Sequence, residues 1–146
     1  MVFDLVQIGR KCREVGALLI VDGTQSVGVM PFDVQLIQPD AVIVAAYKWV
    51  FGPYSSGFGY FGPFFDDGVP IEESWMNREG SDNFQGLCNL QPKYRPKAQR
   101  YNMGEFSQFI QCAMALAAVE KLLSWGVPAV QEYIVEISKL FEVIPL

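Results

Sequence analysis

The sequence predicts an α/β chain, in which a mostly parallel sheet comes first and helices follow. Two uninterrupted apolar runs, residues 17–21 and 41–46, are typical of strands that are buried on both faces, as in a parallel sheet. Residues 22–40 separate the two runs, and this connection is long enough for the crossover that parallel strands require. Apolar residues at helical spacing precede the first run and return after residue 105.

The first predicted helix covers residues 2–15. Its apolar stripe consists of Val2, Leu5, Val6, Gly9, Cys12 and Val15. Gly16 suits the C-terminal end of such a helix, and Asp22-Gly23 is a turn signal at the end of the first strand. A third run, residues 57–62, is aromatic and rich in glycine, and we expect a further strand there.

The rest of the chain divides into an irregular stretch, residues 63–104, and a helical end, residues 105–144. The irregular stretch contains four prolines and a large share of the charged residues, and a stretch of this length usually carries function or contacts a partner. In the helical end, Trp125-Gly126 predicts a stop, and Pro128 fits the first turn of a second helix. We therefore expect an α/β core over residues 1–62, a loop region and two helices, all in one partial domain.

Composition excludes several classes of function. The 146 residues carry 11 Lys and Arg against 16 Asp and Glu, so the net charge is −5 and nucleic acid is not an expected partner. Apolar residues make up 51%, as in a globular chain with a core. The absence of His excludes a Ser-His-Asp or Cys-His pair and any His-containing zinc site within these residues, and we predict no metal site.

The cysteines and the apolar stretches bear on location. Cys12, Cys88 and Cys112 lie far apart and form no CxxC, which is typical of reduced, mostly buried thiols in an intracellular protein. The longest uncharged stretch, residues 49–65, is too short and too often broken by Gly and Pro to span a membrane. The first residues lack the features of a signal peptide. We expect a cytoplasmic chain that has no membrane partner and is a piece of a longer protein.

Two short glycine motifs have the wrong context. Residues 57–62 match GxGxxG, but this motif should follow a strand and open a helix, whereas here it occupies a strand. We expect small residues there because another backbone packs closely. A nucleotide-binding α/β domain stays as a weaker alternative. Gly23 and Gly28 have the spacing of a P-loop, but Val29-Met30 stand where Lys and Ser or Thr are required.

A stronger signal comes from the polar residues that follow the first two strands. Asp22 and Gln25 follow the first run, and Tyr47 and Lys48 follow the second. In open α/β sheets, ligands bind beyond the carboxyl ends of parallel strands, so these four side chains should converge. A Lys amine and a carboxylate suit pyridoxal phosphate, which needs a Schiff-base lysine and a partner for its pyridinium nitrogen. Taken singly, Asp22 could instead cap a turn, and Lys48 could extend to solvent.

In their order along the chain, these residues resemble the class V aminotransferase family of fold-type I pyridoxal-phosphate enzymes. The family includes cysteine desulfurases, selenocysteine lyases, isopenicillin-N epimerases and kynureninases. The matching pattern follows as three segments: Asp22-x-x-Gln25-Ser26, Gly28-x-x-Pro31-Phe32-Asp33, and Tyr47-Lys48-Trp49 with Gly52-Pro53. The resemblance implies part of the large domain of such an enzyme, that is, a partial three-layer sandwich.

The resemblance also implies roles for individual residues. Lys48 would be the catalytic residue that forms the Schiff base and shuttles a proton, and Asp22 would pair with the pyridinium nitrogen. Gln25 would hydrogen-bond the phenolic oxygen of the cofactor, and Tyr47 would reach its phosphate. Residues 102–105 resemble a segment that reaches toward a neighbouring subunit's cofactor, which implies a homodimer for the full-length parent.

Three further residues have two alternative interpretations. Trp75, Arg78 and Ser81 either line the substrate side or belong to a surface loop. Ala45 departs from the family, since many members have a phosphate-binding Ser or Thr there.

The function implied is that of an enzyme fragment. We expect a pyridoxal-phosphate-dependent transaminase or lyase that acts on an amino acid through a Lys48 Schiff base. The family's Gly-rich phosphate loop, its ring-stacking residue and its small domain do not occur among these residues, so we expect no turnover by this chain alone. The alternative is a non-catalytic remnant or partner chain, which keeps the sheet but lacks a complete cofactor site.

Overall fold

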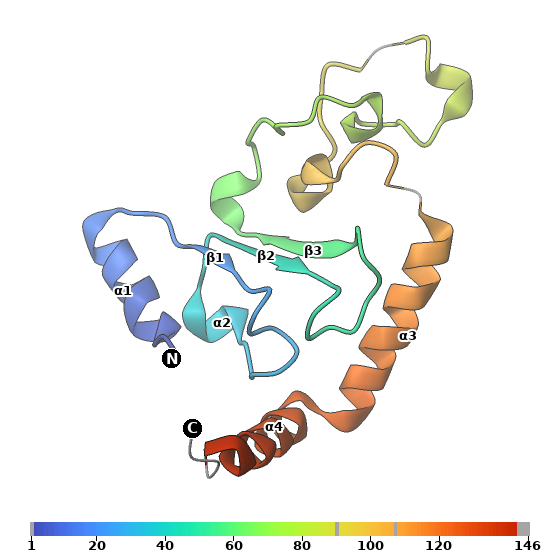
Figure 1. Cartoon of the computed structure of the whole chain (residues 1–146). Coiled ribbons are helices and arrows are strands. Elements are labelled where there is room, and N and C mark those ends of the chain that lie inside the picture. The colour runs from blue at the N-terminus through green and yellow to red at the C-terminus, as the bar shows by residue number, and fades with distance from the viewer. Residues whose placement is uncertain (1, 90, 107, 143–146) are drawn as a thin grey trace.

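A computed structural model describes residues 2–89, 91–106 and 108–142 of the chain (Figure 1). In chain order, the helices and strands are α1 (Leu5–Val15), β1 (Ile20–Asp22), α2 (Val34–Ile37), β2 (Ala41–Ala45), β3 (Gly57–Phe61), α3 (Phe109–Trp125) and α4 (Val127–Glu142). In the described part of the chain between β3 and α3 lie four short 3-10 helices, namely η1 (Pro63–Phe65), η2 (Trp75–Asn77), η3 (Phe84–Gly86) and η4 (Lys97–Tyr101). The predicted α/β class is confirmed, and the described residues of 63–104 contain short helical turns and one isolated β-bridge, between Arg78 and Tyr94.

The three strands form one sheet in the order β1-β2-β3. β1 and β2 are parallel, with Val21 opposite Val42, as the long connection predicted. β3 is antiparallel to β2, with Tyr60 opposite Val42, so the described sheet is mixed. β3 returns directly beside β2 after the loop of residues 46–56, and no crossover is needed for an antiparallel neighbour.

The ends of the first elements differ from the sequence prediction for local reasons. α1 begins at Leu5 because the Asp4 side chain accepts a hydrogen bond from the Gln7 amide at 2.9 Å, which caps the helix. Gly16 ends α1 in the left-handed conformation, as predicted. The Ala17 amide is still bonded to the Cys12 carbonyl at 2.9 Å, so strand pairing starts only at Ile20.

The core lies on one face of the sheet. Val21, Val42 and Val44 are buried together with Ala46 and Val50 from the loop after β2, and parts of α1 and α3 pack against them. On the other face, Ile20 is 61% exposed and Ile43 is 45% exposed. The prediction that both runs are buried on both faces is therefore wrong for this chain. Successive strand residues point to opposite faces, and the described elements fill only one of these faces.

Gly57 of β3 occupies a position of close backbone approach, as predicted, because a Cβ there would lie 2.8 Å from the Val44 carbonyl oxygen. At Gly59 the prediction is wrong, since the near neighbour of a Cβ is the ring of Phe61 at 2.7 Å and not another backbone. β3 is followed by the 3-10 turn η1 and not by an α-helix. The structural context of a dinucleotide fingerprint is therefore not present at this segment.

Aromatic residues join the irregular region to the sheet. The rings of Phe61 in β3 and Tyr101 in η4 stack with their centroids 4.4 Å apart. The Tyr101 hydroxyl donates to the Phe65 carbonyl at 2.6 Å, and the buried Arg100 donates to the Gly68 carbonyl at 2.9 Å. These contacts hold η4 against the edge strand, although the region has little regular structure.

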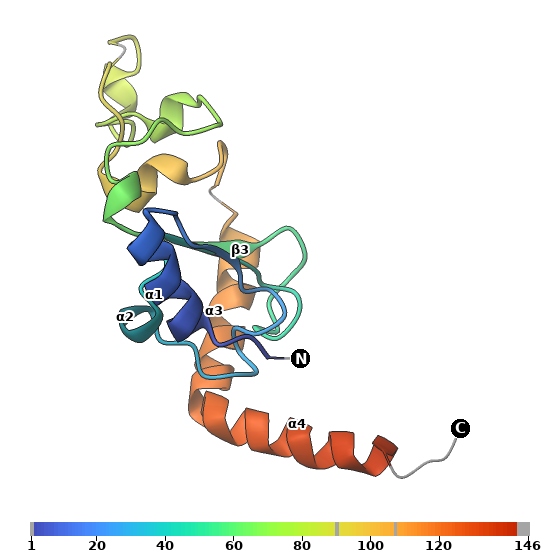
Figure 2. The same cartoon turned by 90° about the vertical axis from the view of Figure 1, so that its left-hand side faces the viewer.

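The two C-terminal helices meet at Gly126, and Pro128 lies in the first turn of α4, as predicted. α3 runs beside the sheet, whereas α4 extends away from it (Figures 1 and 2). Within the described residues, no single helix is long and apolar enough to cross a membrane, and only α3 and α4 taken together, bent by 78°, reach that length and composition.

All three cysteines are free thiols, but the prediction that they are mostly buried is wrong. Cys12 is partly buried, and Cys88 and Cys112 are exposed. Cys88 lies in a turn of the irregular region, and Cys112 lies on the side of α3 that lines a cavity.

Candidate functional site

The residues predicted at the strand ends lie beyond two adjacent parallel strands. Asp22 is the last residue of β1, and Lys48 follows the end of β2 at Ala45. Because β1 and β2 are parallel neighbours, both side chains lie at the same edge of the sheet.

The loop that carries Lys48 is closed by its own backbone. The Gly52 amide donates to the Ala46 carbonyl at 2.8 Å, and the Phe51 amide donates to the Lys48 carbonyl at 3.1 Å. Ala46 and Val50 belong to the buried core and flank Lys48 on either side. The core therefore fixes the backbone of the half-buried Lys48.

Gly28, in the turn after β1, lies directly against the backbone of the same loop. Its φ is +102°, which favours glycine, and a Cβ there would lie 2.4 Å from the Trp49 carbonyl oxygen. The turn after β1 and the loop of Lys48 thus approach each other so closely that a side chain at residue 28 does not fit. This contact is the physical reason for a glycine in the Gly-x-x-Pro segment.

The electrostatics of the edge favour an ionised Asp22. The Thr24 side chain and then the Thr24 amide, at 3.0 Å from Asp22 Oδ1, hydrogen-bond this carboxylate and lower its pKa from the ordinary value of 3.8. Partial desolvation opposes this shift, and the positive charge of Lys48 adds to it. Asp22 is therefore a carboxylate at neutral pH, and the amine of Lys48 lies within its electrostatic reach.

Tyr47 lies beside Lys48. Its ring stacks on that of Tyr54 with centroids 4.7 Å apart, and Lys48 Nζ lies 5.6 Å from the centroid of the Tyr47 ring. Gln25 lies exposed in the turn that follows β1. The structure thus brings Asp22, Tyr47 and Lys48 to one edge of the sheet, with Gln25 in the adjoining turn.

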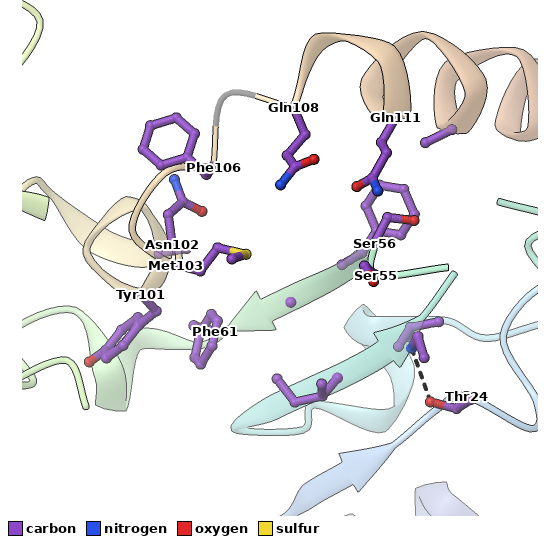
Figure 3. A pocket seen from close by; sticks show the side chains of 18 of the residues that line it. Thr24, Ser55, Ser56, Phe61, Tyr101, Asn102, Met103, Phe106, Gln108 and Gln111 are labelled. Atoms are coloured by element: carbon purple, nitrogen blue, oxygen red, sulfur yellow. Dashed lines mark hydrogen bonds between the residues drawn. The ribbon is translucent and has the colours of Figure 1, made fainter. Parts of the chain in front are cut away.

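Thr24 is a residue that the sequence analysis missed. Its hydroxyl oxygen accepts a hydrogen bond from the Ala45 amide at 3.0 Å, so it links the ends of β1 and β2 (Figure 3). The signal that could have found it is its place two residues after Asp22, where a Thr commonly bonds its neighbours in a turn.

A cavity of about 850 Å³ adjoins this edge. Ile20, Ile43 and Phe61 belong to its sheet side, and residues of η4 and of the first half of α3 form the opposite side (Figure 3). Asp22 and Thr24 belong to its lining, but Gln25, Tyr47 and Lys48 do not. The cavity therefore extends from the Asp22 side of the edge across the exposed sheet face.

The residues of the irregular region fall into two groups. Asn102 and Met103 line the cavity. Arg78 donates to Glu73 at 2.6 Å, and the buried Ser81 donates to the Met76 carbonyl at 2.9 Å, so both stabilise the region internally. Trp75 is half exposed in η2 and lies edge-on to another aromatic ring of the same region. These contacts favour the surface-loop interpretation of Trp75, Arg78 and Ser81.

Comparisons with known proteins show which families this chain is similar to. Residues 1–62 match the family model described as aminotransferase class V. A probable cysteine desulfurase from Methanothermobacter thermautotrophicus is 42% identical over 57 residues, which are 39% of this chain and 14% of that protein. The cysteine desulfurase IscS of Proteus mirabilis is 40% identical over 60 residues, which are 41% of this chain and 15% of that protein.

The structural similarity covers more of the chain than the sequence match does. An apo cysteine desulfurase from Thermococcus onnurineus aligns with a TM-score of 0.68 at 23% identity, over 86% of this chain and 30% of that chain. Residues 1–62 are thus similar to class V aminotransferases, as the sequence indicated, and most of the chain has the fold of part of a cysteine desulfurase. The chain spans less than a third of the length of that solved structure.

Proposed function

We propose that this chain contributes the lysine and the ring-nitrogen partner of a pyridoxal-phosphate site in a class V aminotransferase-like enzyme that acts on an amino acid. Lys48 is the proposed catalytic residue, and Asp22, Gln25 and Tyr47 are the proposed cofactor-binding residues. Two of the similar proteins are named cysteine desulfurases, so an amino acid that carries sulfur is a natural first substrate to test.

The observation that carries the proposal is the placement of an ionised carboxylate, Asp22, and an amine, Lys48, beyond the ends of two adjacent parallel strands. The pKa of Asp22 is lowered by the hydrogen bonds of Thr24, so its carboxylate suits a protonated ring nitrogen. Lys48 stands on a loop that the buried core anchors on both sides. The cavity beside Asp22 has an apolar sheet face, which suits a flat ring. Asp22 and the apolar face beside it therefore suit the ring of the cofactor, and Lys48 follows the end of the neighbouring strand.

Each residue has a defined task in this proposal. Bound at this edge, the cofactor would supply an aldehyde for amine attachment and a ring that accepts electrons from the substrate. Lys48 would hold the cofactor through its amine and would move a proton at the substrate's α-carbon. The Asp22 carboxylate would hold the protonated ring nitrogen. The Gln25 amide would hold the phenolic oxygen of the ring, and Tyr47 would hold the phosphate.

A non-catalytic chain is the second candidate, and the exposed sheet face favours it. Ile20 and Ile43 leave apolar surface uncovered at the proposed site, as in a chain that keeps the sheet and requires other segments or chains to complete the site. The two candidates differ in whether these 146 residues alone direct the cofactor to Lys48.

The test is reductive trapping of the cofactor on the purified chain. The protein is mixed with pyridoxal phosphate, reduced with borohydride and digested, and the modified lysine is located by mass spectrometry. The proposal predicts label concentrated on Lys48, loss of that label in Lys48→Arg, and no change in Lys11→Arg, which alters an exposed lysine of α1. Label spread over the surface lysines and unchanged in Lys48→Arg would favour the non-catalytic candidate.

A further inference from the structure

We propose that Thr24 is a positioning residue of this edge: its hydroxyl oxygen fixes the end of β2 that leads to Lys48, and its amide orients the Asp22 carboxylate. The importance of this role for the cofactor rests on the proposed function. The hydrogen bonds of Thr24 are present in the chain without cofactor, so they can be tested independently of cofactor binding.

The first contact closes the parallel ladder between β1 and β2. The Gly23 amide donates to the Ile43 carbonyl at 2.8 Å and extends the pairing one residue beyond β1. After Gly23 the chain turns away, because the Ser26 and Val27 amides bond back to the Gly23 carbonyl at 3.0 and 2.8 Å. The Ala45 amide of β2 would then face no strand on that side. The Thr24 hydroxyl oxygen, at 3.0 Å, accepts this hydrogen bond in place of a strand carbonyl.

The second contact fixes Asp22. The Thr24 amide donates to Asp22 Oδ1 at 3.0 Å, which holds the carboxylate over the turn. A hydroxyl that accepts a hydrogen bond still has its own proton to donate. The Thr24 side chain is also the leading cause of the lowered pKa of Asp22. Thr24 therefore contacts the end of β2 through its hydroxyl oxygen and the Asp22 carboxylate through its amide.

This arrangement has a consequence for Lys48. The loop that carries Lys48 starts immediately after Ala45, and Ala46 is bonded at both of its backbone groups, to Ser56 and to Gly52. Loss of the hydroxyl would free the Ala45 amide on the β1 side and release one of the groups that hold Asp22. The relative position of the carboxylate and the amine would then vary more, while the buried core residues stay unchanged.

The variants Thr24→Val and Thr24→Ser separate the hydroxyl from the shape of the side chain. Val keeps the branched shape of Thr but cannot hydrogen-bond, whereas Ser keeps the hydroxyl and loses only a methyl group. Three readouts are compared with the wild-type chain: the titration of the Asp22 carboxyl carbon by NMR, the exchange rate of the Ala45 amide, and the yield of borohydride-trapped pyridoxal phosphate on Lys48. The exchange rate of the Val21 amide, in the buried centre of β1, serves as the internal control.

We expect Thr24→Val to raise the pKa of Asp22 toward its ordinary value and to speed Ala45 exchange about five- to ten-fold, as the loss of one hydrogen bond predicts. The exchange of Val21 should stay within about two-fold of wild type, and the yield on Lys48 should fall several-fold. Thr24→Ser should behave as wild type in all three readouts. Unchanged Asp22 titration and Ala45 exchange in Thr24→Val, or a Ser variant that behaves as Val does, would overturn the proposal.

The same experiment distinguishes this proposal from the proposed function. If wild type shows no label on Lys48 but Thr24→Val changes both the Asp22 titration and the Ala45 exchange, then the positioning role stands and the proposed function fails. If wild type concentrates the label on Lys48 and Thr24→Val does the same, with unchanged Asp22 titration and Ala45 exchange, then the proposed function stands and the positioning role is rejected.

Discussion

Gly28 offers a direct test of the contact between the turn after β1 and the loop of Lys48. In Gly28→Ala, the new Cβ would lie 2.4 Å from the Trp49 carbonyl oxygen and 2.7 Å from the Trp49 carbonyl carbon. Both atoms are backbone, so relief requires a shift of the loop or of the turn. The φ of +102° is also unfavourable for alanine.

Two costs combine in this variant. A non-glycine residue at positive φ costs about 1–2 kcal/mol. Overpacking against atoms that cannot move aside costs about 1–3 kcal/mol more. We therefore expect Gly28→Ala to lower the free energy of unfolding by about 2–5 kcal/mol. Gly16→Ala is the matched control, because Gly16 also has positive φ, +70°, but a Cβ there would meet no atom within 4 Å. Its cost should be about 1–2 kcal/mol.

Urea unfolding, followed by far-UV circular dichroism, measures both variants. The decisive quantity is the loss of unfolding free energy in Gly28→Ala minus the loss in Gly16→Ala, because this subtraction removes the cost of a positive φ. A difference of more than about 1 kcal/mol is expected from the close backbone contact. Equal destabilisation of the two variants would refute the tight approach of residues 28 and 49.

Three further predictions concern the elements around the site. Asp33→Ala removes the side chain that accepts hydrogen bonds from two amides at the start of α2, and urea unfolding should show a loss of about 1 kcal/mol. Val44→Ala removes two methyl groups from a residue that is 5% exposed, and the same assay should show a loss of about 2 kcal/mol, against less than about 0.5 kcal/mol for the exposed Val135→Ala. Asp22→Asn should lower stability at pH 7 by less than about 1 kcal/mol, because the carboxylate is exposed. The folded pKa of Asp22 lies below 3.8, so the difference in unfolding free energy between wild type and Asp22→Asn should have its full size above pH 3.8. It should disappear as the pH falls through the folded pKa, and unfolding curves at pH 7 and pH 2 test this.

Much of the sheet and its edge was predictable because the relevant signals are local. The apolar runs placed β1 and β2, the long connection predicted their parallel pairing, and the strand-end rule placed Asp22 and Lys48 at one edge. The rule that an uninterrupted apolar run is a strand buried on both faces gave the wrong burial, because it assumes that other layers cover both faces of the sheet. In this chain Ile20 and Ile43 stay exposed, while Val21 and Val42 are buried.

Other features depend on contacts between distant residues and could not be predicted. The hydrogen bond from Ala45 to Thr24 joins residues 21 positions apart, and the position of Thr24 after Asp22 does not indicate which distant amide its hydroxyl accepts. The cavity likewise combines strand residues with Tyr101 of η4 and Cys112 of α3, which meet only in the folded chain.

The central claim is that Lys48 and Asp22 form the chemical centre of a cofactor site. The most direct measurement is the share of borohydride-trapped pyridoxal phosphate that peptide mapping finds on Lys48 in wild type and in Asp22→Asn. The account predicts that Lys48 carries most of the label in wild type, and that Asp22→Asn lowers this share. Label that follows only the exposure of each lysine, and is the same in both proteins, would contradict the account.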